Sequence, residues 1–531
     1  MLFHTWPFLI FLLIVLPVYF VLRQTSLWLP WLLIASYVFY GWWNPYYLLL
    51  VIYSTALDYL LVTLMDHCPS DERMPVLAAL KRGPKDRTLK IAFVSAALLA
   101  LVLIAGAWVG PSVLLPTFVV FALLVSLMAV GAWLSSRGLW LAISIVNNLA
   151  LLLFFKYARF VEENLNHVFT WLHLAIHLHD PATLMPPGIA YTLPVGISFF
   201  TFQSMSYTID FYLGRVARER NIIRFATFVC FFPQLMAGPI ERARQMLPQF
   251  QKAPVFRIAN LTDGASLFLV GLFKKVAVAN YLSIYVDRVY DNPQGRDGAE
   301  LAMATFAFAW QIFFDFSGYT DMARGVARVM GFNLMLNFNN PYLASGLGEF
   351  WARWHISLST WFRDYLYIPL GGSRNGTFYT YRNLLIVFLV SGIWHGSAWT
   401  FAIWGLLHAL GVMLTRELER SEFYRSRVPL VAKQLSVFLY VCLAWIFFRA
   451  GSLPDALFIV KHIFTMPWGR IDMPVLMLAL VLIIWVYQWI YESRYRPFLA
   501  YGPLRVGCAV IMLLYLSLCS SDGQPFIYFQ F

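Results

Sequence analysis

The chain has 531 residues, of which 60% are hydrophobic and 18% aromatic, while only 12% are charged. This composition is too apolar for a water-soluble fold of that length and is typical of a polytopic membrane protein. The net charge of +12 is spread over loops between apolar stretches and forms no compact basic face, so we expect no nucleic-acid partner. We expect basic loops to face the cytoplasm and to attract anionic membrane lipids.

Apolar stretches of about 20 residues, the length that crosses a bilayer as a helix, recur along the chain. They lie near residues 7–22, 28–65, 91–133, 139–155, 190–212, 262–288, 301–330, 383–415, 434–449, 474–491 and 505–519. Several of them are long enough for two segments, so we predict an all-α polytopic membrane protein with roughly 11–14 membrane segments. The polar interruptions are loop-sized, and we expect a single membrane domain over residues 1–531.

Two histidines each follow a tryptophan within an apolar stretch: His355 after Trp354, and His395 after Trp394. An ionisable side chain at membrane depth is costly and indicates a functional site by default. A neutral imidazole accepts a proton near pH 7 and can act as a general base on a hydroxyl. The alternative is that each histidine makes one structural hydrogen bond between helices.

Residues 346–366 are predicted to form one amphipathic helix at the membrane interface, with His355 beside its aromatic stripe. His395 is expected within a second helical region, 383–410, where Gly392 and Gly396 allow another backbone to approach closely. On a straight helix His408 would lie about 220° around from His395. We therefore expect His408 to point away and leave it out of the predicted site.

Other polar residues receive structural interpretations. Asp315 and Asp321 are six positions apart and would not share a helix face, so each is expected to be a hydrogen-bonded anchor. The remaining candidates, with metal-ligand spacing, are His173, His177, His179 and Asp180. The glutamate of a zinc-protease motif is missing there, and the five cysteines show no paired spacing. We predict a polar, periplasm-facing cluster and no metal site.

Five motifs together resemble the membrane-bound O-acyltransferase (MBOAT) family, and within it the group of alginate O-acetyltransferase membrane subunits. They are residues 237–240, 314–322, 350–367, 392–396 and 526–531. The resemblance covers residues 1 to about 65 and about 140 to 531. The chain departs from the family pattern at 90–138, where we expect an additional pair of membrane segments.

The resemblance implies a helical bundle with a central tunnel in the bacterial inner membrane, with His395 as catalytic base and His355 as the second site residue. His355 would steady the developing oxyanion or orient the thioester. It implies transfer of acetyl from a cytoplasmic thioester, most plausibly acetyl-CoA, for O-acetylation of an exopolysaccharide such as alginate or cellulose. The expected partner is a periplasmic or membrane-anchored polysaccharide acetyltransferase, and no bound cofactor is expected.

Two alternatives stay open at this point: a D-alanyl-type acyl transfer subunit, and a polytopic transporter or flippase. The absence of an internal repeat in the sequence counts against the transporter. For the donor we expect binding by Arg353, Arg363 and Arg374, whose guanidinium groups suit phosphates, and by Trp354 and Trp394. The alternative for each arginine is that it extends to lipid head groups.

Overall fold

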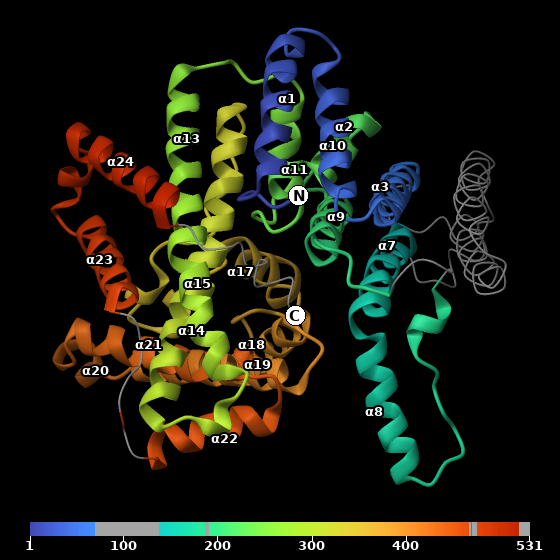
Figure 1. The fold of residues 1–531 in the computed structure, drawn as a ribbon. Coiled ribbons are helices and arrows are strands. Elements are labelled where there is room, and N and C mark those ends of the chain that lie inside the picture. The colour runs from blue at the N-terminus through green and yellow to red at the C-terminus, as the bar shows by residue number, and fades with distance from the viewer. Residues whose placement is uncertain (69–136, 186–190, 467–468, 470–474, 520–531) are drawn as a thin grey trace. The chain divides into compact units, whose positions relative to one another are not determined.

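The computed structural model describes residues 1–68, 137–185, 191–466, 469 and 475–519. Every regular element in these ranges is helical (Figure 1), which confirms the predicted all-α class. The additional pair of segments predicted at 90–138 lies outside the described residues except for its last two positions, and motif 526–531 lies outside them entirely. The chain divides into two compact units, which are described separately.

Seven described stretches are long and apolar enough to cross a membrane. They are Pro45–Asp66, Arg137–Trp171, Ile258–Tyr290, Gly298–Val329, Trp399–Leu418, Leu430–Arg449 and Val475–Glu492. Three shorter apolar helices are Trp6–Leu22, Trp28–Gly41 and Gly502–Leu518. The chain is therefore a multi-pass membrane protein, while the total of 11–14 segments stays a prediction because it includes residues outside the described ranges.

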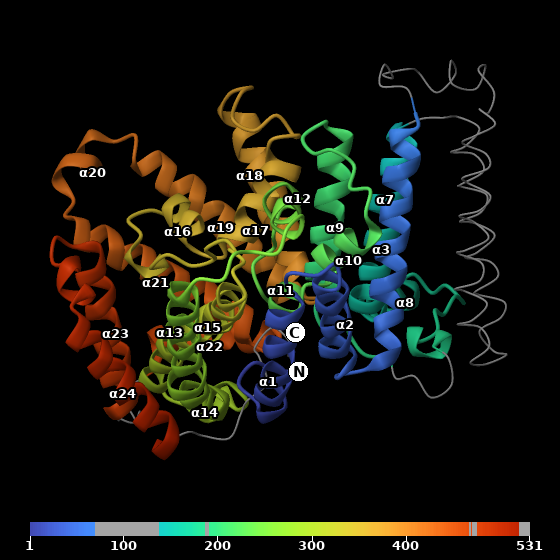
Figure 2. The ribbon, with the colours of Figure 1, turned by 90° about the horizontal axis from the view of Figure 1, so that it is seen from above.

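The first unit contains residues 13–236 and 240–253, together with Met1. After α1 (Trp6–Leu22), which contributes to both units, its helices are α2 (Trp28–Gly41), α3 (Pro45–Asp66), α7 (Arg137–Leu152), α8 (Ala158–Trp171), α9 (Ile197–Tyr212), α10 (Ile222–Cys230), α11 (Phe232–Leu235) and α12 (Ala243–Met246). Helices α3, α7 and α9 pack side by side (Figure 2).

A fully buried carboxylate ties these three helices together. Asp58 of α3 accepts hydrogen bonds from Ser144 (2.6 Å) and Asn148 (2.9 Å) of α7, and from the Ser204 hydroxyl of α9. A buried polar group is costly unless it is hydrogen-bonded. Three donors from two neighbouring helices therefore make the position of Asp58 a strong constraint on how the first unit packs.

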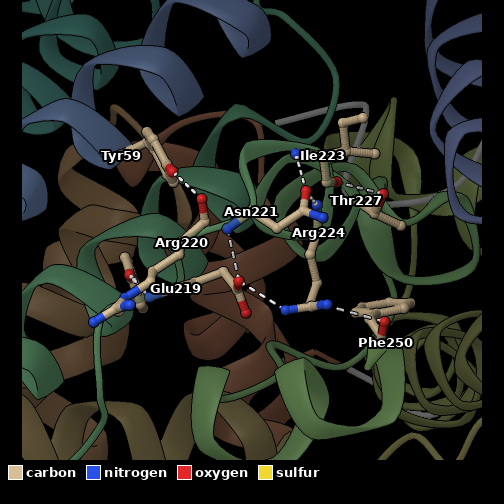
Figure 3. Close-up of polar contacts among 9 residues, drawn as sticks. Tyr59, Glu219, Arg220, Asn221, Ile223, Arg224, Thr227 and Phe250 are labelled. Atoms are coloured by element: carbon tan, nitrogen blue, oxygen red, sulfur yellow. Dashed lines mark hydrogen bonds and ion pairs between the residues drawn. The ribbon is translucent and has the colours of Figure 1, made fainter. Parts of the chain in front are cut away.

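The connection between α9 and α10 is fixed by polar contacts (Figure 3). Asn221 caps α10, and its backbone amide donates to Glu219, which also accepts from Arg224; both distances are 2.8 Å. The Tyr59 hydroxyl of α3 donates to the Arg220 carbonyl at 2.6 Å. This basic loop, expected on the cytoplasmic side, is thus held against α3.

The second unit contains residues 2–12, 237–239 and 254–531. Its helices are α13 (Ile258–Leu272), α14 (Asn280–Tyr290), α15 (Gly298–Val329), α16 (Leu347–Arg353), α17 (Ile356–Phe362), α18 (Thr377–His395), α19 (Trp399–Leu418), α20 (Glu422–Arg427), α21 (Leu430–Arg449), α22 (Leu453–Thr465), α23 (Val475–Glu492) and α24 (Gly502–Cys519). The long helix α15 packs along α13 (Figure 1).

Glycines bring α13 and α15 into backbone contact. A Cβ added to Gly271 would lie 2.5 Å from the Gly318 carbonyl oxygen, and one on Gly264 would lie 2.6 Å from that of Gly325. Small residues at matching positions of two apolar helices allow this close packing. The contact positions α15, whose inner face is next to the candidate site.

Ion pairs add to the same interface. Lys275, in the π-helical turn after α13, pairs with Asp315 at 2.6 Å, and both side chains are buried. Lys274 pairs with Asp321 at 2.7 Å. These contacts fit the interpretation of the two aspartates as structural anchors, and they supply the paired cations that buried carboxylates require.

We predict that Gly271→Ala destabilises the protein by about 1–3 kcal/mol, because the new methyl group must push apart two backbones in contact. Gly507→Ala is the control, since position 507 lies on α24 with open space around it. Thermal unfolding of the purified protein in detergent measures the difference. Equal midpoints for the two variants would contradict the close α13–α15 contact.

Candidate functional site

The predicted helix 346–366 is interrupted at the first histidine. α16 ends at Arg353 and α17 begins at Ile356, with His355 between them in the left-handed conformation (φ 42°, ψ 54°). A side chain in this region is strained by about 1–2 kcal/mol. The expectation of one continuous helix was therefore wrong at His355.

A loop upstream holds the interruption open. The backbone amide of Ile356 donates to the Asn337 carbonyl, and the amide of Asn339 donates to the Arg353 carbonyl, both at 2.9 Å. These bonds satisfy the backbone groups that the break removes from the helix. No glycine or proline stands at the break, so the sequence carries no local signal for it.

Asn337 also determines the tautomer of His355, whose side chain is fully buried. The Asn337 Oδ1 accepts from the backbone amide of Ser357 at 3.2 Å, which identifies it as the amide oxygen. His355 Nδ1 lies 3.1 Å from the same oxygen and must therefore donate its proton. The neutral His355 ring consequently carries its lone pair on Nε2.

The second histidine also lies at a helix end. α18 ends at His395, an extended segment begins at Gly396, and α19 starts at Trp399. A Cβ on Gly392 would collide with the Phe401 carbonyl of α19, so the predicted close backbone approach is confirmed. The expectation of one helix over 383–410 was wrong, because the chain reverses after Gly396.

His395 is almost completely buried, and its Nδ1 lies 2.7 Å from the Ser391 carbonyl oxygen. A carbonyl only accepts, so Nδ1 donates and Nε2 carries the lone pair. The His395 ring contacts Trp394 at 4.9 Å and Trp404 at 4.7 Å between ring centroids. Rigid aromatic neighbours and one backbone hydrogen bond thus fix the orientation of the ring.

The two histidines belong to one buried aromatic layer in the second unit. His355 contacts Phe316 of α15 at 4.6 Å, while the adjacent Trp354 packs on Trp445 at 5.1 Å, and Trp445 in turn stacks on Trp404. Burial lowers the pKa of His355 well below its usual value, and the nearby His395 lowers it further. The His355 imidazole is therefore neutral at physiological pH.

The structure brings His408 into this layer, against the sequence expectation. His408 is fully buried and contacts Trp404 at 4.7 Å, the same centroid distance at which His395 contacts Trp404. Trp351 donates its indole N–H to His408 Nδ1 at 3.2 Å. The straight-helix angle failed because the break after Gly396 places His395 and His408 on different helices.

A cavity of about 250 Å³ adjoins the layer. Its lining includes Trp351, Ser359, Arg363, Phe388, Ser391 and Val412. Trp351 and Ser391 are the partners of His408 and His395, respectively. Two residues of the cavity wall thus also hold imidazoles in place. The predicted site residues Trp354 and Trp394 are instead buried in the aromatic layer.

The three predicted arginines have different surroundings. Arg353 pairs with Glu349 at 2.8 Å and also with Glu492 of α23. Arg363 lines the cavity, pairs with its neighbour Asp364 and has a side chain that is 60% exposed. Arg374 is exposed in the loop between α17 and α18. Of the three, Arg363 lies at the cavity.

The histidine-rich segment after α8 has a different structure from a metal site. Asp180 caps a short 3₁₀ helix through the Ala182 amide and pairs with Arg159 at 3.2 Å. The backbone hydrogen bond to Ala182 and the nearby Arg159 hold the pKa of Asp180 below its usual value. Within the described ranges, no three His, Cys, Asp or Glu residues are grouped to hold a metal ion.

The apolar helical fold and the buried imidazole pair are features of an acyl-transfer enzyme of the membrane. The model of the MBOAT, membrane-bound O-acyltransferase family matches residues 197–453, which include both histidines. The chain belongs to the membrane-bound O-acyltransferase family, and it is an O-acyltransferase.

Among curated relatives, the probable alginate O-acetylase AlgI of Pseudomonas putida is 36% identical over 74% of this chain and 84% of its own length. The peptidoglycan O-acetyltransferase of Helicobacter pylori is 36% identical over 61% of this chain and 64% of its own length. The teichoic acid D-alanyltransferase of Bacillus subtilis is 30% identical over 41% of this chain and 57% of its own length.

We predict that Asn337→Ala lowers acyl-transfer activity by about 100-fold, because a misplaced or wrongly protonated imidazole loses its reactive geometry. Asn337→Asp should retain most of the activity, since a carboxylate oxygen still accepts from His355 Nδ1. The comparison requires initial rates for the two variants at equal amounts of folded protein. Equal activity of Asn337→Ala and the unaltered protein would show that Asn337 does not orient His355.

Proposed function

We propose that this O-acyltransferase transfers an acetyl group from acetyl-CoA to a hydroxyl, as a step in O-acetylation of an exopolysaccharide such as alginate or cellulose. The observation that carries the proposal is the buried His395, whose Nδ1 donates to the Ser391 carbonyl, so that the lone pair of the neutral ring is on Nε2. Its relatives include a probable alginate O-acetylase and a peptidoglycan O-acetyltransferase. Both of these relatives are named for O-acetylation of a polymer.

In the proposed step, His395 Nε2 removes the proton from the acceptor hydroxyl as the hydroxyl oxygen attacks the thioester carbonyl carbon. The carbon–sulfur bond breaks, and the thiolate takes the proton back from the imidazolium. The products are an acetyl ester and the free thiol of CoA. The neutral starting state of His395 is regenerated without any further reactant.

The tautomer of His355 favours one of its two expected roles. Its Nε2 carries a lone pair while Asn337 holds the proton at Nδ1. A lone pair repels an oxyanion, so this ring does not steady one in its neutral state. We propose that His355 accepts a hydrogen bond and orients the reactants, as the second site residue beside His395.

The donor proposal rests on the position of Arg363 at the cavity. Its side chain is 60% exposed and can bind the phosphates of CoA, while the acetyl end would enter the apolar interior. Arg374 on the nearby exposed loop would add to the attraction. Arg353 contributes less, because Glu349 and Glu492 already engage it.

The proposed location is the bacterial inner membrane, with the donor on the cytoplasmic side and a periplasmic or membrane-anchored polysaccharide acetyltransferase as partner. The basic loops, expected in the cytoplasm by the positive-inside rule, support the orientation. The competing proposal is D-alanyl transfer from a carrier protein, which the teichoic acid D-alanyltransferase relative supports over a smaller part of the chain. Release of CoA thiol from acetyl-CoA by the purified protein separates the two.

We predict that His395→Ala lowers acetyl transfer by about 10² to 10⁴, because it removes a general base. The measurements are thiol release from acetyl-CoA and the acetyl content of the polymer in a strain carrying only the variant. His462→Ala is a matched control: His462 Nδ1 also contacts the carbonyl one turn earlier, at 2.8 Å, on α22. Near-normal polymer acetylation by His395→Ala would overturn the assignment.

Removing the charge of Arg363 should weaken donor binding. We predict that Arg363→Gln raises KM for acetyl-CoA roughly tenfold at low ionic strength, since a charge-assisted hydrogen bond contributes about 1.5–3 kcal/mol, and less at high salt. Arg420→Gln is the control, because Arg420 pairs with Glu417 and does not line the cavity. An unchanged KM in the triple variant of Arg353, Arg363 and Arg374 would assign these residues to lipid anchoring.

A further inference from the structure

Two N–H groups on α19 are buried beside His395 without an acceptor. They are the indole Nε1 of Trp404 and the imidazole Nε2 of His408, and both side chains are fully buried. No hydrogen-bond acceptor for either group exists among the residues that the structure describes. An unsatisfied buried donor costs about 1–3 kcal/mol, so two of them next to a reactive imidazole call for an explanation.

The His408 nitrogen is a donor because of Trp351. An indole N–H only donates, so His408 Nδ1 must accept at 3.2 Å and the neutral ring carries its proton on Nε2. A second proton on Nδ1 would place two donors face to face. Trp351 thus keeps His408 in the tautomer opposite to that of His355 and His395.

The placement of the two donors is also specific. Trp404 and His408 are four residues apart on α19 and therefore share a helix face. Both His395 and His408 contact the Trp404 ring at 4.7 Å, so the two imidazole centroids are separated by at most twice that distance. Because Nδ1 of His408 faces Trp351, its Nε2 lies on the ring edge turned away from Trp351.

We propose that Trp404 Nε1–H and His408 Nε2–H are hydrogen-bond donors to the acyl carbonyl oxygen of the bound thioester. This inference rests on the proposed function and adds the groups that would stabilise negative charge on the thioester carbonyl oxygen. As the hydroxyl oxygen of the acceptor forms a bond to the thioester carbon, the carbonyl π electrons move onto the carbonyl oxygen, and the two neutral N–H groups stabilise the negative charge there. Neither donor gives up its proton, and the negative charge leaves with the thiolate when the carbon–sulfur bond breaks.

Two substitutions of His408 separate this role from a structural one. His408→Asn keeps an acceptor near Nδ1 for Trp351 but removes the N–H at the Nε2 position. His408→Gln places an amide N–H near Nε2 and gives up the bond with Trp351. If His408 is a hydrogen-bond donor to the substrate, kcat of His408→Asn should fall about 10²- to 10³-fold, with a nearly unchanged melting temperature. The variant His408→Gln should have a lower melting temperature yet keep most of the kcat of the unaltered protein.

If His408 is purely structural, activity follows stability, so His408→Asn should be more active than the less stable His408→Gln. That result would overturn the proposal. Should His408→Gln not fold, full kcat in His408→Asn alone would still overturn it. Trp404→Phe keeps an aromatic ring while removing the N–H, and it should also lower kcat. Its control is Trp489→Phe, on the exposed surface of α23.

Two measurements distinguish the proposed hydrogen-bond donors from the proposal that acetyl-CoA is the acyl donor. Thiol release from acetyl-CoA is measured on the purified protein, and the acyl content of the polymer is measured in cells that carry each variant. No thiol release by the unaltered protein would overturn acetyl-CoA as donor, while the cellular readout would still test His408 and Trp404. Normal acyl content in cells with His408→Asn and with Trp404→Phe would overturn only the proposal that His408 and Trp404 donate hydrogen bonds to the acyl carbonyl oxygen.

Discussion

The proposed chemistry of this site depends on the hydrogen bonds that determine which nitrogen of each buried imidazole carries the proton. Asn337 and the Ser391 carbonyl accept from Nδ1 of His355 and His395, which leaves lone pairs on both Nε2 atoms. Trp351 donates to His408 and leaves a proton on its Nε2. In a buried site these hydrogen bonds are worth more than in water, so they fix the tautomers on which the proposed roles of base and hydrogen-bond donor depend.

These partners are available because helices are interrupted or end at both His355 and His395. A continuous helix through His355 would satisfy its own backbone, and the amide of Ile356 would not reach the loop at Asn337. The left-handed conformation at His355 costs energy that only a well-packed environment sustains. The close contact of α18 and α19 at Gly392 serves the same purpose, because it places the end of α18 against Trp404.

The sequence predicted the features that depend on composition and on local motifs. The apolar stretches led to the all-α membrane fold, and the two Trp-His pairs led to the buried histidines. Features that depend on tertiary context were not predictable in the same way. Asn337 lies 18 positions before His355 in an ordinary loop, and no glycine or proline stands at the break between α16 and α17. His408 was left out by a straight-helix argument, although Gly396 gave a usable signal that the helix ends there.

The lining of the cavity separates the charged Arg363 from the apolar interior where acyl transfer is proposed. Among the described residues that line it, Arg363 is the charged one, and its side chain is mostly exposed. The interior presents aromatic and aliphatic walls, with buried imidazoles and indoles behind them. Such an interior cannot compensate the negative charge of the CoA phosphates, because a buried charge needs an opposite charge or hydrogen-bond partners beside it. The proposed acyl donor would therefore keep its phosphates at Arg363 and extend only its acyl thioester inward. There the N–H groups would bind the carbonyl oxygen, and the His395 lone pair would act on the attacking hydroxyl.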